Sequence, residues 1–226
     1  MDRKTHLGVL LALALALPSL TFAQKNWKAG FAVGGASSQW YFSTPEEDPD
    51  FHWTNAWGLH FALPVEIGIN DFLAFQGVLG WTQKGAKVTL DYFDGYYHVQ
   101  AESKAQVNYF DVPLLLKVST KPGKVRGFAN AGVYLGFALN GKIKATATVT
   151  DENGHKETET DTEDIDFDEM EMNRTDLGLV VGGGLRFDQY FFEVRYLHGS
   201  TNLDNSGDAE AAIYNRCVTI SAGCFF

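Results

Sequence analysis

The chain has 226 residues, a formal net charge of −10 and only two cysteines. This acidic balance excludes a nucleic-acid partner, because binding to a phosphate backbone draws on an excess of lysine and arginine. The length suits one domain once an N-terminal signal is set aside, and the 14% aromatic content with 23 glycines favours β-structure.

The N-terminus has the pattern of an export signal. Arg3 and Lys4 precede an apolar run at 7–17, and small residues follow up to Ala23. This order is typical of a cleaved signal peptide, and the run is too short to cross a bilayer. We therefore expect residues 1–23 to be removed and residues 24–226 to form one exported domain.

The first clear element after the signal is a strand with two unlike faces at 57–69. Every odd position in it is apolar, whereas the even positions include His60 and Glu66. A period of two predicts a β-strand with one apolar and one polar side. The same alternation recurs in seven other segments, namely 27–41, 72–82, 107–118, 126–140, 174–187, 190–198 and 214–226.

The connections between these segments alternate between short and long. The short ones fall at 70–71, 120–124 and 188–189, and the long ones fall near 43–52, 91–98, 145–172 and 200–211. An even number of strands with this alternation predicts an eight-stranded antiparallel transmembrane β-barrel with short periplasmic turns and long extracellular loops. We therefore expect an integral protein of the outer membrane of a Gram-negative bacterium, surrounded by outer-membrane lipid and lipopolysaccharide.

The positions of two prolines do not fit a closed barrel well. Pro64 and Pro113 lie inside strands, although a closed barrel has no free edge for proline, so each is expected to mark a bulge or a missing ladder bond.

Cys217 and Cys224 lie in one strand roughly 23 Å apart, at ~3.3 Å per residue, and on opposite faces. Neither a disulfide nor a metal site is expected from them.

The polar face of the strands predicts a charged interior. Charges enclosed in a narrow barrel must pair, because an unpaired buried charge is costly. Bulky Tyr109, Phe128 and Tyr134 share this face with Lys84, so a packed plug is expected, and a narrow channel is the alternative. The predicted lumen network comprises Glu66, Asp111, Lys117, Arg174, Asp176, Arg186, Glu193 and Arg195. Within it, Glu193 and Arg195 lie on one face of one strand, and Asp176 and Arg186 lie on its predicted neighbour.

One segment carries almost all of the net charge. Residues 151–171 contain eleven acidic residues and one lysine. The carboxylates of Asp164, Asp166 and Asp168 alternate, and clustered oxygens suit Ca²⁺ or Mg²⁺. We expect a solvated loop without a resident cofactor. Two alternatives are a bound Ca²⁺ or Mg²⁺ ion and cations that bridge the loop to lipopolysaccharide phosphates.

An enzyme is the alternative from another function class. His198, Ser200 and Asp204 cluster in sequence near the outer end of a strand, where a lipid-modifying hydrolase or acyltransferase would need them. Such a trio in a polar loop is common by chance, and its chemistry depends on geometry. The preferred interpretation is a protein that is not an enzyme.

Three motifs resemble one family. "NYFDVPLLLK" (108–117), "DLGLVVGGGLRF" (176–187) with "FFEVRYLHGSTNL" (191–203), and the terminal "CVTISAGCFF" are similar to the PorT-like outer-membrane β-barrel proteins of Bacteroidetes. That family is an architecture more than an activity, and some members are components of type IX secretion. The resemblance implies a structural or protein-interaction role, such as a component of an envelope or secretion complex.

The last residue has a separate prediction. Phe226 ends a strand of alternating apolar residues. It therefore resembles the C-terminal signal read by the barrel-assembly machinery, which would be a transient partner during biogenesis. An aromatic residue at this position also suits the periplasmic girdle of a barrel.

Overall fold

The computed structural model describes residues 27–43, 51–93, 95–207 and 212–226. The signal peptide expected at 1–23 and the domain start at 24 lie outside this part of the chain. The described residues form nine strands: β1 (Trp27–Phe42), β2 (Phe51–Gly68), β3 (Leu73–Phe93), β4 (His98–Ser119), β5 (Val125–Thr150), β6 (Lys156–Asp164), β7 (Thr175–Phe187), β8 (Tyr190–Gly199) and β9 (Ile213–Phe225). They include no helix long and apolar enough to cross a membrane.

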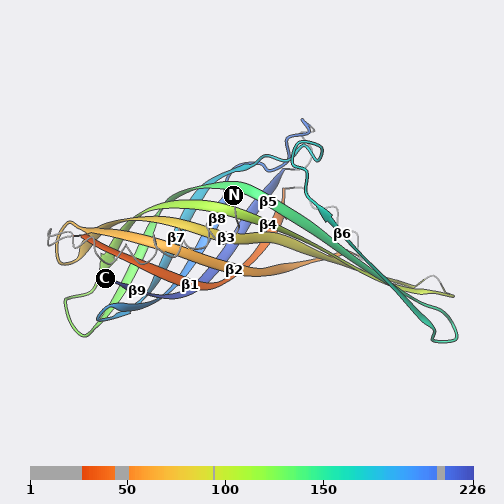
Figure 1. Cartoon of the computed structure of the whole chain (residues 1–226), viewed down its shortest axis with the longest axis horizontal. Helices are drawn as coiled ribbons and strands as arrows, with labels where there is room; N and C mark the ends of the chain where they lie inside the picture. Colours follow the sequence, from red (N-terminus) through yellow and green to blue (C-terminus); the bar gives the residue numbers. More distant parts are fainter. Residues whose placement is uncertain (1–26, 44–50, 94, 208–211) are drawn as a thin grey trace, which may run out of the picture.

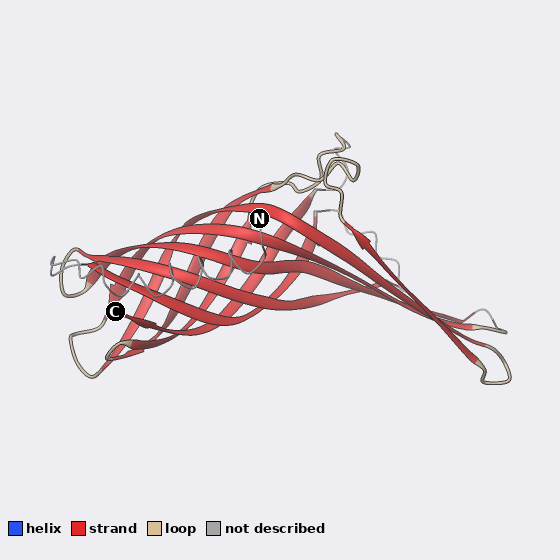
Figure 2. Ribbon diagram, in the orientation of Figure 1, coloured by secondary structure: helices blue, strands red, loops and turns tan. Residues whose placement is uncertain are grey.

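Eight of these strands close into a ring. Neighbours pair antiparallel in the order β1, β2, β3, β4, β5, β7, β8, β9, and β9 pairs with β1 again. Figure 2 shows the tilted strands wound around a common axis. The predicted eight-stranded barrel is confirmed, and β6 is an addition to it that pairs with β5 alone.

The outer surface of the ring is apolar. On β2, Trp57 is 65% exposed and Leu59 53%, whereas His60 and Glu66, which point to the other side of the same strand, are buried. The same arrangement holds on the other ring strands, with exposed Phe75, Leu114 and Leu179 among the outward residues. A closed sheet that turns its apolar side outward is stable in a lipid environment, where this surface needs no water.

The two strand prolines interrupt one ladder each without changing its register. Between β1 and β2, the pairs Ala29 with Val65 and Ala32 with Ala62 flank an unpaired step that contains Pro64. Pro113 lies in the same kind of step between β3 and β4. Of the two expected outcomes, the missing ladder bond is found at both prolines, because proline has no N–H to donate.

Three strands run much further than the sequence pattern predicts. β3 extends to Phe93 and β4 begins at His98, so they reach both ends of the expected loop 91–98, and β5 and β6 occupy much of the expected loop 145–172. About 10 residues are enough for a tilted strand to cross a bilayer, whereas β3, β4 and β5 have 21, 22 and 26. The excess forms a narrow, twisted sheet that leaves the barrel at the end opposite the C-terminus (Figure 1).

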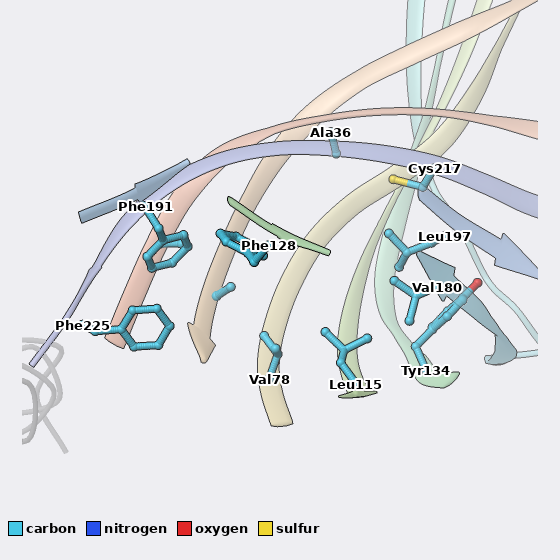
Figure 3. Close-up of a cluster of buried hydrophobic side chains, with 12 residues drawn as sticks. Ala36, Val78, Leu115, Phe128, Tyr134, Val180, Phe191, Leu197, Cys217 and Phe225 are labelled. Carbon is cyan, nitrogen blue, oxygen red and sulfur yellow. The ribbon is translucent and has the colours of Figure 1, made fainter. Parts of the chain in front are cut away.

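Part of the barrel interior is an apolar cluster. Phe128, Phe191 and Phe225 gather toward one end of it, while Leu115 and Val180 lie toward the other (Figure 3). Cys217 is a buried member and Cys224 is partly exposed, and both thiols are free, in agreement with the sequence.

Candidate functional site

An ionic cluster closes the outer half of the lumen. The Nζ atom of Lys84, which is fully buried, lies 2.8 Å from Oδ1 of Asp111 and 3.3 Å from Oδ2 of Asp176. The hydroxyl of Tyr134 and the amide of Asn215 each donate to the same Asp176 oxygen at 3.0 Å. Five strands are thus joined across the lumen by one ammonium group, two carboxylates and their hydrogen bonds.

A second ionic cluster lies toward the periplasmic end. Lys117 donates to Glu66 at 2.7 Å, and its Nζ atom lies 4.0 Å from the centre of the Phe128 ring. Arg186 and Lys28 approach the other oxygen of Glu66 at 3.9 and 4.0 Å. One carboxylate therefore faces three cations, and the excess positive charge is concentrated at this end of the lumen.

A third ion pair completes the interior. Arg195 contacts Glu193 on the same strand at 2.7 Å, and the Asn130 amide donates to the other Glu193 oxygen at 2.5 Å. Glycines give these long side chains room. A Cβ atom on Gly182 would lie 2.7 Å from both the Arg195 Cγ and the Asn130 Oδ1. The glycine-rich β7 is therefore a packing requirement of the charged lumen.

The predicted lumen residues are distributed over these three clusters, with one exception. Arg174 lies at the mouth, where its guanidinium stacks 4.6 Å from the Phe167 ring centre and approaches Asp168 at 3.9 Å. The partner of Asp176 is Lys84, whereas Arg186 contacts Glu66. The alternation of its strand places Lys84 in the interior, but the sequence did not indicate that it would lie between Asp111 and Asp176.

The extracellular mouth is covered by part of the acidic segment. Ile165 and Phe167 turn inward and pack on Val107, Tyr109 and Ala138. A backbone pairing of Met172 with Asp204 holds this segment against the last extracellular loop, whose Leu203 is fully buried. Apolar side chains within the segment therefore anchor it, while its carboxylates remain in water.

The three candidate cation ligands have separate neighbours. Asp164 approaches Lys142 at 3.4 Å and Asp168 approaches Arg174, whereas Asp166 accepts the backbone N–H groups of Asp168 and Glu169. No group of three or more His, Cys, Asp or Glu side chains in the described part of the chain is arranged to hold a metal ion. Ca²⁺ or Mg²⁺ at residues 151–171 stays a prediction.

The candidate catalytic trio is not assembled by hydrogen bonds. The Nδ1 atom of His198 lies 3.3 Å from the Tyr196 hydroxyl, and Asp204 accepts the backbone N–H of Ser206. The backbone N–H of Ser200 donates to the carbonyl of Leu177. Hydrogen bonding to Ser206 also lowers the pKa of the Asp204 carboxyl. A general base needs the nucleophile within hydrogen-bond reach, and these contacts do not supply it.

The C-terminal residue lies on the outer surface of the ring. Phe226 is 64% exposed and stacks on Phe31 at 6.1 Å between ring centres. It adjoins other outward aromatic side chains at the end with the short turns, as a girdle residue would. Recognition of Phe226 by the barrel-assembly machinery stays a prediction.

The extracellular sheet has two unlike faces. On the face that continues the lumen, cross-strand rows connect apolar residues of β3 and β4 with small residues of β5 and then with acids of β6. One row runs Leu90, Ala101, Ala147, Glu159. A parallel row runs Tyr92, Val99, Val149, Glu157. This face, defined by Val88, Leu90, Tyr92, Val99, Ala101, Ala145, Ala147 and Val149, is called the apolar face below.

The opposite face of the extracellular sheet is polar and hollowed. A cavity of about 380 Å³ is lined there mainly by polar side chains, including His52, Thr89, Gln100, Thr146 and Thr148. At its edge, hydrogen bonds from Gln100 and His98 lower the pKa of Asp91. This carboxylate is fully exposed, so the contact fixes local geometry more than global stability.

Comparison with known proteins identifies the architecture. Residues 22–205 match the family described as "Outer membrane protein beta-barrel domain". No curated protein matches the sequence. Among solved structures, the attachment invasion locus protein Ail of Yersinia pestis, in complex with the heparin analogue sucrose octasulfate, is 14% identical with a TM-score of 0.38, covering 89% of this chain and 99% of its own.

Two other solved structures have similar values. The outer membrane protein OprG of Pseudomonas aeruginosa is 12% identical with a TM-score of 0.38, over 90% of this chain and 97% of its own. Neisserial surface protein A is 11% identical with a TM-score of 0.37, over 88% and 97%.

Proposed function

Because this chain belongs to the outer membrane protein beta-barrel domain family and is integral to the outer membrane of a Gram-negative bacterium, we propose that it binds a protein through its extracellular sheet. The barrel serves as the anchor. The single observation that supports this role is the apolar face, carried beyond the membrane by β3, β4 and β5 and bordered by the acidic β6.

The apolar face is only partly covered by the residues that the structure describes. Above the membrane a strand gains nothing from apolar side chains unless another surface covers them. Tyr92 is 48% exposed and Val149 36% exposed, and the nearby Trp53 of β2 is 48% exposed. Exposed aromatic and aliphatic side chains grouped on a rigid sheet are typical of the centre of a protein interface.

The border of this face indicates the chemistry of the partner. Glu157, Glu159, Asp161 and Glu163 point to the same side as the apolar residues, and all of β6 is exposed. The outer edge of β6 pairs with no described strand, so its backbone groups can accept an added strand. The best-fitting partner has an extended segment that combines apolar and basic residues.

A channel or an enzyme has less support. Three ionic clusters and the Phe167 segment fill the lumen, so a pore would require several of these contacts to break. His198, Ser200 and Asp204 are not joined by hydrogen bonds. The similarity of the sequence motifs to PorT-like proteins favours a partner within an envelope or secretion complex.

Affinity purification from native outer membranes in mild detergent, followed by quantitative mass spectrometry, tests the proposal. A triple variant, Val88→Thr, Leu90→Thr and Val149→Thr, keeps strand propensity but removes the apolar face. The matched control, Thr89→Val, Thr146→Val and Thr148→Val, changes the opposite face of the same strands.

We expect a stoichiometric partner with the wild type and the control, and its loss with the apolar-face variant. The double change Glu157→Gln and Glu159→Gln should make the release of the partner less dependent on salt concentration, because fewer charges contribute to binding. A barrel purified alone, or a partner retained equally by all variants, would contradict the proposal.

A further inference from the structure

Three lysines stand in a row on the outward face of the strands just above the barrel. Lys87 of β3 is the direct cross-strand partner of Lys104 of β4, and Lys104 is the direct partner of Lys144 of β5. Like charges directly opposite each other in a sheet are destabilising. Lys142 lies on the same face, one row closer to the barrel. A chain with net charge −10 thus gathers four lysines on one small surface.

The contacts around these lysines neutralise only part of their charge. Lys87 pairs with Glu102 at 2.6 Å, and Lys142 approaches Asp164 at 3.4 Å. Lys104 donates to a neutral group, the backbone carbonyl of Trp57, at 3.1 Å. The side chain of Lys144 is exposed and makes no hydrogen bond or ion pair with any residue that the structure describes. The four lysines therefore keep an excess of positive charge.

The position of the row relative to the membrane follows from strand geometry. At ~3.3 Å per residue and a tilt of about 40°, the lipid-facing stretch of β4 from Val118 to Phe110 covers roughly 20 Å of the ~25 Å apolar band. The band therefore ends about two residues beyond Phe110. Lys142 and the row of Lys104 then lie roughly 5 to 10 Å above it, the depth at which lipid headgroups begin.

The side chain of Lys104 points toward the membrane. Its Nζ atom reaches from β4 across β3 to the carbonyl of Trp57, and Gln106 donates to the same oxygen at 3.1 Å. The Trp57 side chain is 65% exposed on the lipid-facing surface of β2. Lys104 is thus held beside a lipid-facing aromatic residue, with its charge directed to the interface.

We propose that Lys87, Lys104, Lys142 and Lys144 form a binding site for the phosphate groups of the outer-leaflet glycolipid. The four lysines point to the same side of their strands as the lipid-facing residues of the barrel below. A bound lipid would therefore place its acyl chains against Phe110 and Leu139 and its phosphates among the lysines. A phosphate between opposed ammonium groups converts the repulsion within the row into attraction. This site is separate from the apolar face, because residues of the row point to the other side of the sheet.

Native mass spectrometry of the folded full-length protein in detergent, titrated with bisphosphorylated lipid A, tests this site. An attraction of ~1 kcal/mol per lysine corresponds to about fivefold in affinity. Lys144→Gln should therefore lower the affinity about fivefold, and Lys144→Arg should preserve it. The triple change Lys87→Gln, Lys104→Gln and Lys144→Gln should lower it roughly a hundredfold, toward the level of lipid A without phosphates.

The control is Lys121→Gln with Lys124→Gln in a periplasmic turn, which should leave lipid binding unchanged. Folding of each variant is checked by its heat-modifiable gel mobility. Equal binding of lipid A by the wild type and the triple variant, or equal binding of lipid A without phosphates, would overturn the proposal. A site with millimolar affinity for inorganic phosphate would release lipid A at ~10 mM phosphate. Such displacement would assign the site to free phosphate and would also overturn the proposal.

Discussion

Within the barrel, the inward side of β3 carries Gln76 and Lys84, whereas beyond the mouth the same side of the same strand carries Val88 and Leu90. The outward side changes in the opposite direction, from Leu79 to Lys87. Both faces therefore exchange polarity where the strand leaves the membrane. The alternation of side chains continues along the whole strand, and the surroundings of each face, lipid or water, decide whether that face is apolar or polar.

Removing the central cation of the lumen should destabilise the barrel more than any other change considered below. Lys84→Met leaves Asp111 and Asp176 buried without their counter-ion, which we expect to lower the free energy of unfolding by about 3–5 kcal/mol. Urea unfolding in lipid vesicles, followed by tryptophan fluorescence, measures the loss.

Two further variants separate charge from packing at this position. Lys84→Met combined with Asp111→Asn and Asp176→Asn should recover much of the lost stability, because no unpaired charge remains. Lys121→Met in a periplasmic turn should be neutral. A Lys84→Met barrel as stable as the wild type would show that the cluster is not a structural requirement.

Filling the space beside the Glu193 and Arg195 pair should have a smaller effect. Gly182→Ala brings a Cβ atom to 2.7 Å from the Arg195 Cγ, and overpacking of this kind costs about 1–3 kcal/mol. The matched change is Gly77→Ala, whose Cβ would lie 3.9 Å from Leu114. Equal unfolding midpoints for the two variants would mean that the lumen relaxes around an added methyl group.

Shortening the extracellular sheet should have the smallest effect on stability. Ile143 and Glu163 are direct cross-strand partners, so an Asn-Gly turn can replace residues 144–162 without disturbing the ring. The free energy of unfolding should change by less than about 1 kcal/mol, because β5 closes the barrel through its earlier part. A larger loss would indicate that the barrel and the sheet are one cooperative unit.

The sequence predicts the barrel well because lipid imposes a strict alternation on every ring strand. The outward residues of 57–69 are apolar and the inward ones include His60 and Glu66, as found. The sheet beyond the membrane escaped prediction because the inward face of β3 changes from Lys84 to apolar Val88 and Leu90, which ends the pattern expected of a barrel strand. In β6, moreover, the threonines alternate only with acidic residues. Their β-branched side chains still favour strands, but such propensity is a weaker signal than a period of two.

The site was only partly predictable for a related reason. Parity assigns a side chain to the lumen, but the height at which it meets a partner depends on strand stagger, which the sequence does not give. The contacts of Asp176 with Lys84 and of Arg186 with Glu66 could therefore not be predicted. Arg174 precedes β7 and remains at the mouth. Lys87 and Lys104 lie in different strands, and only the observed register reveals that they are opposite each other.

The acidic edge strand also affects how copies of the protein meet on a crowded cell surface. Two β6 edges aligned antiparallel would oppose the carboxylates of Glu157, Glu159, Asp161 and Glu163 at about 5 Å across the junction. Such contact is repulsive in neutral water, so identical barrels would stay dispersed although each presents an unpaired strand edge. The same edge remains open to a segment of opposite charge, which makes the surface selective between self and partner.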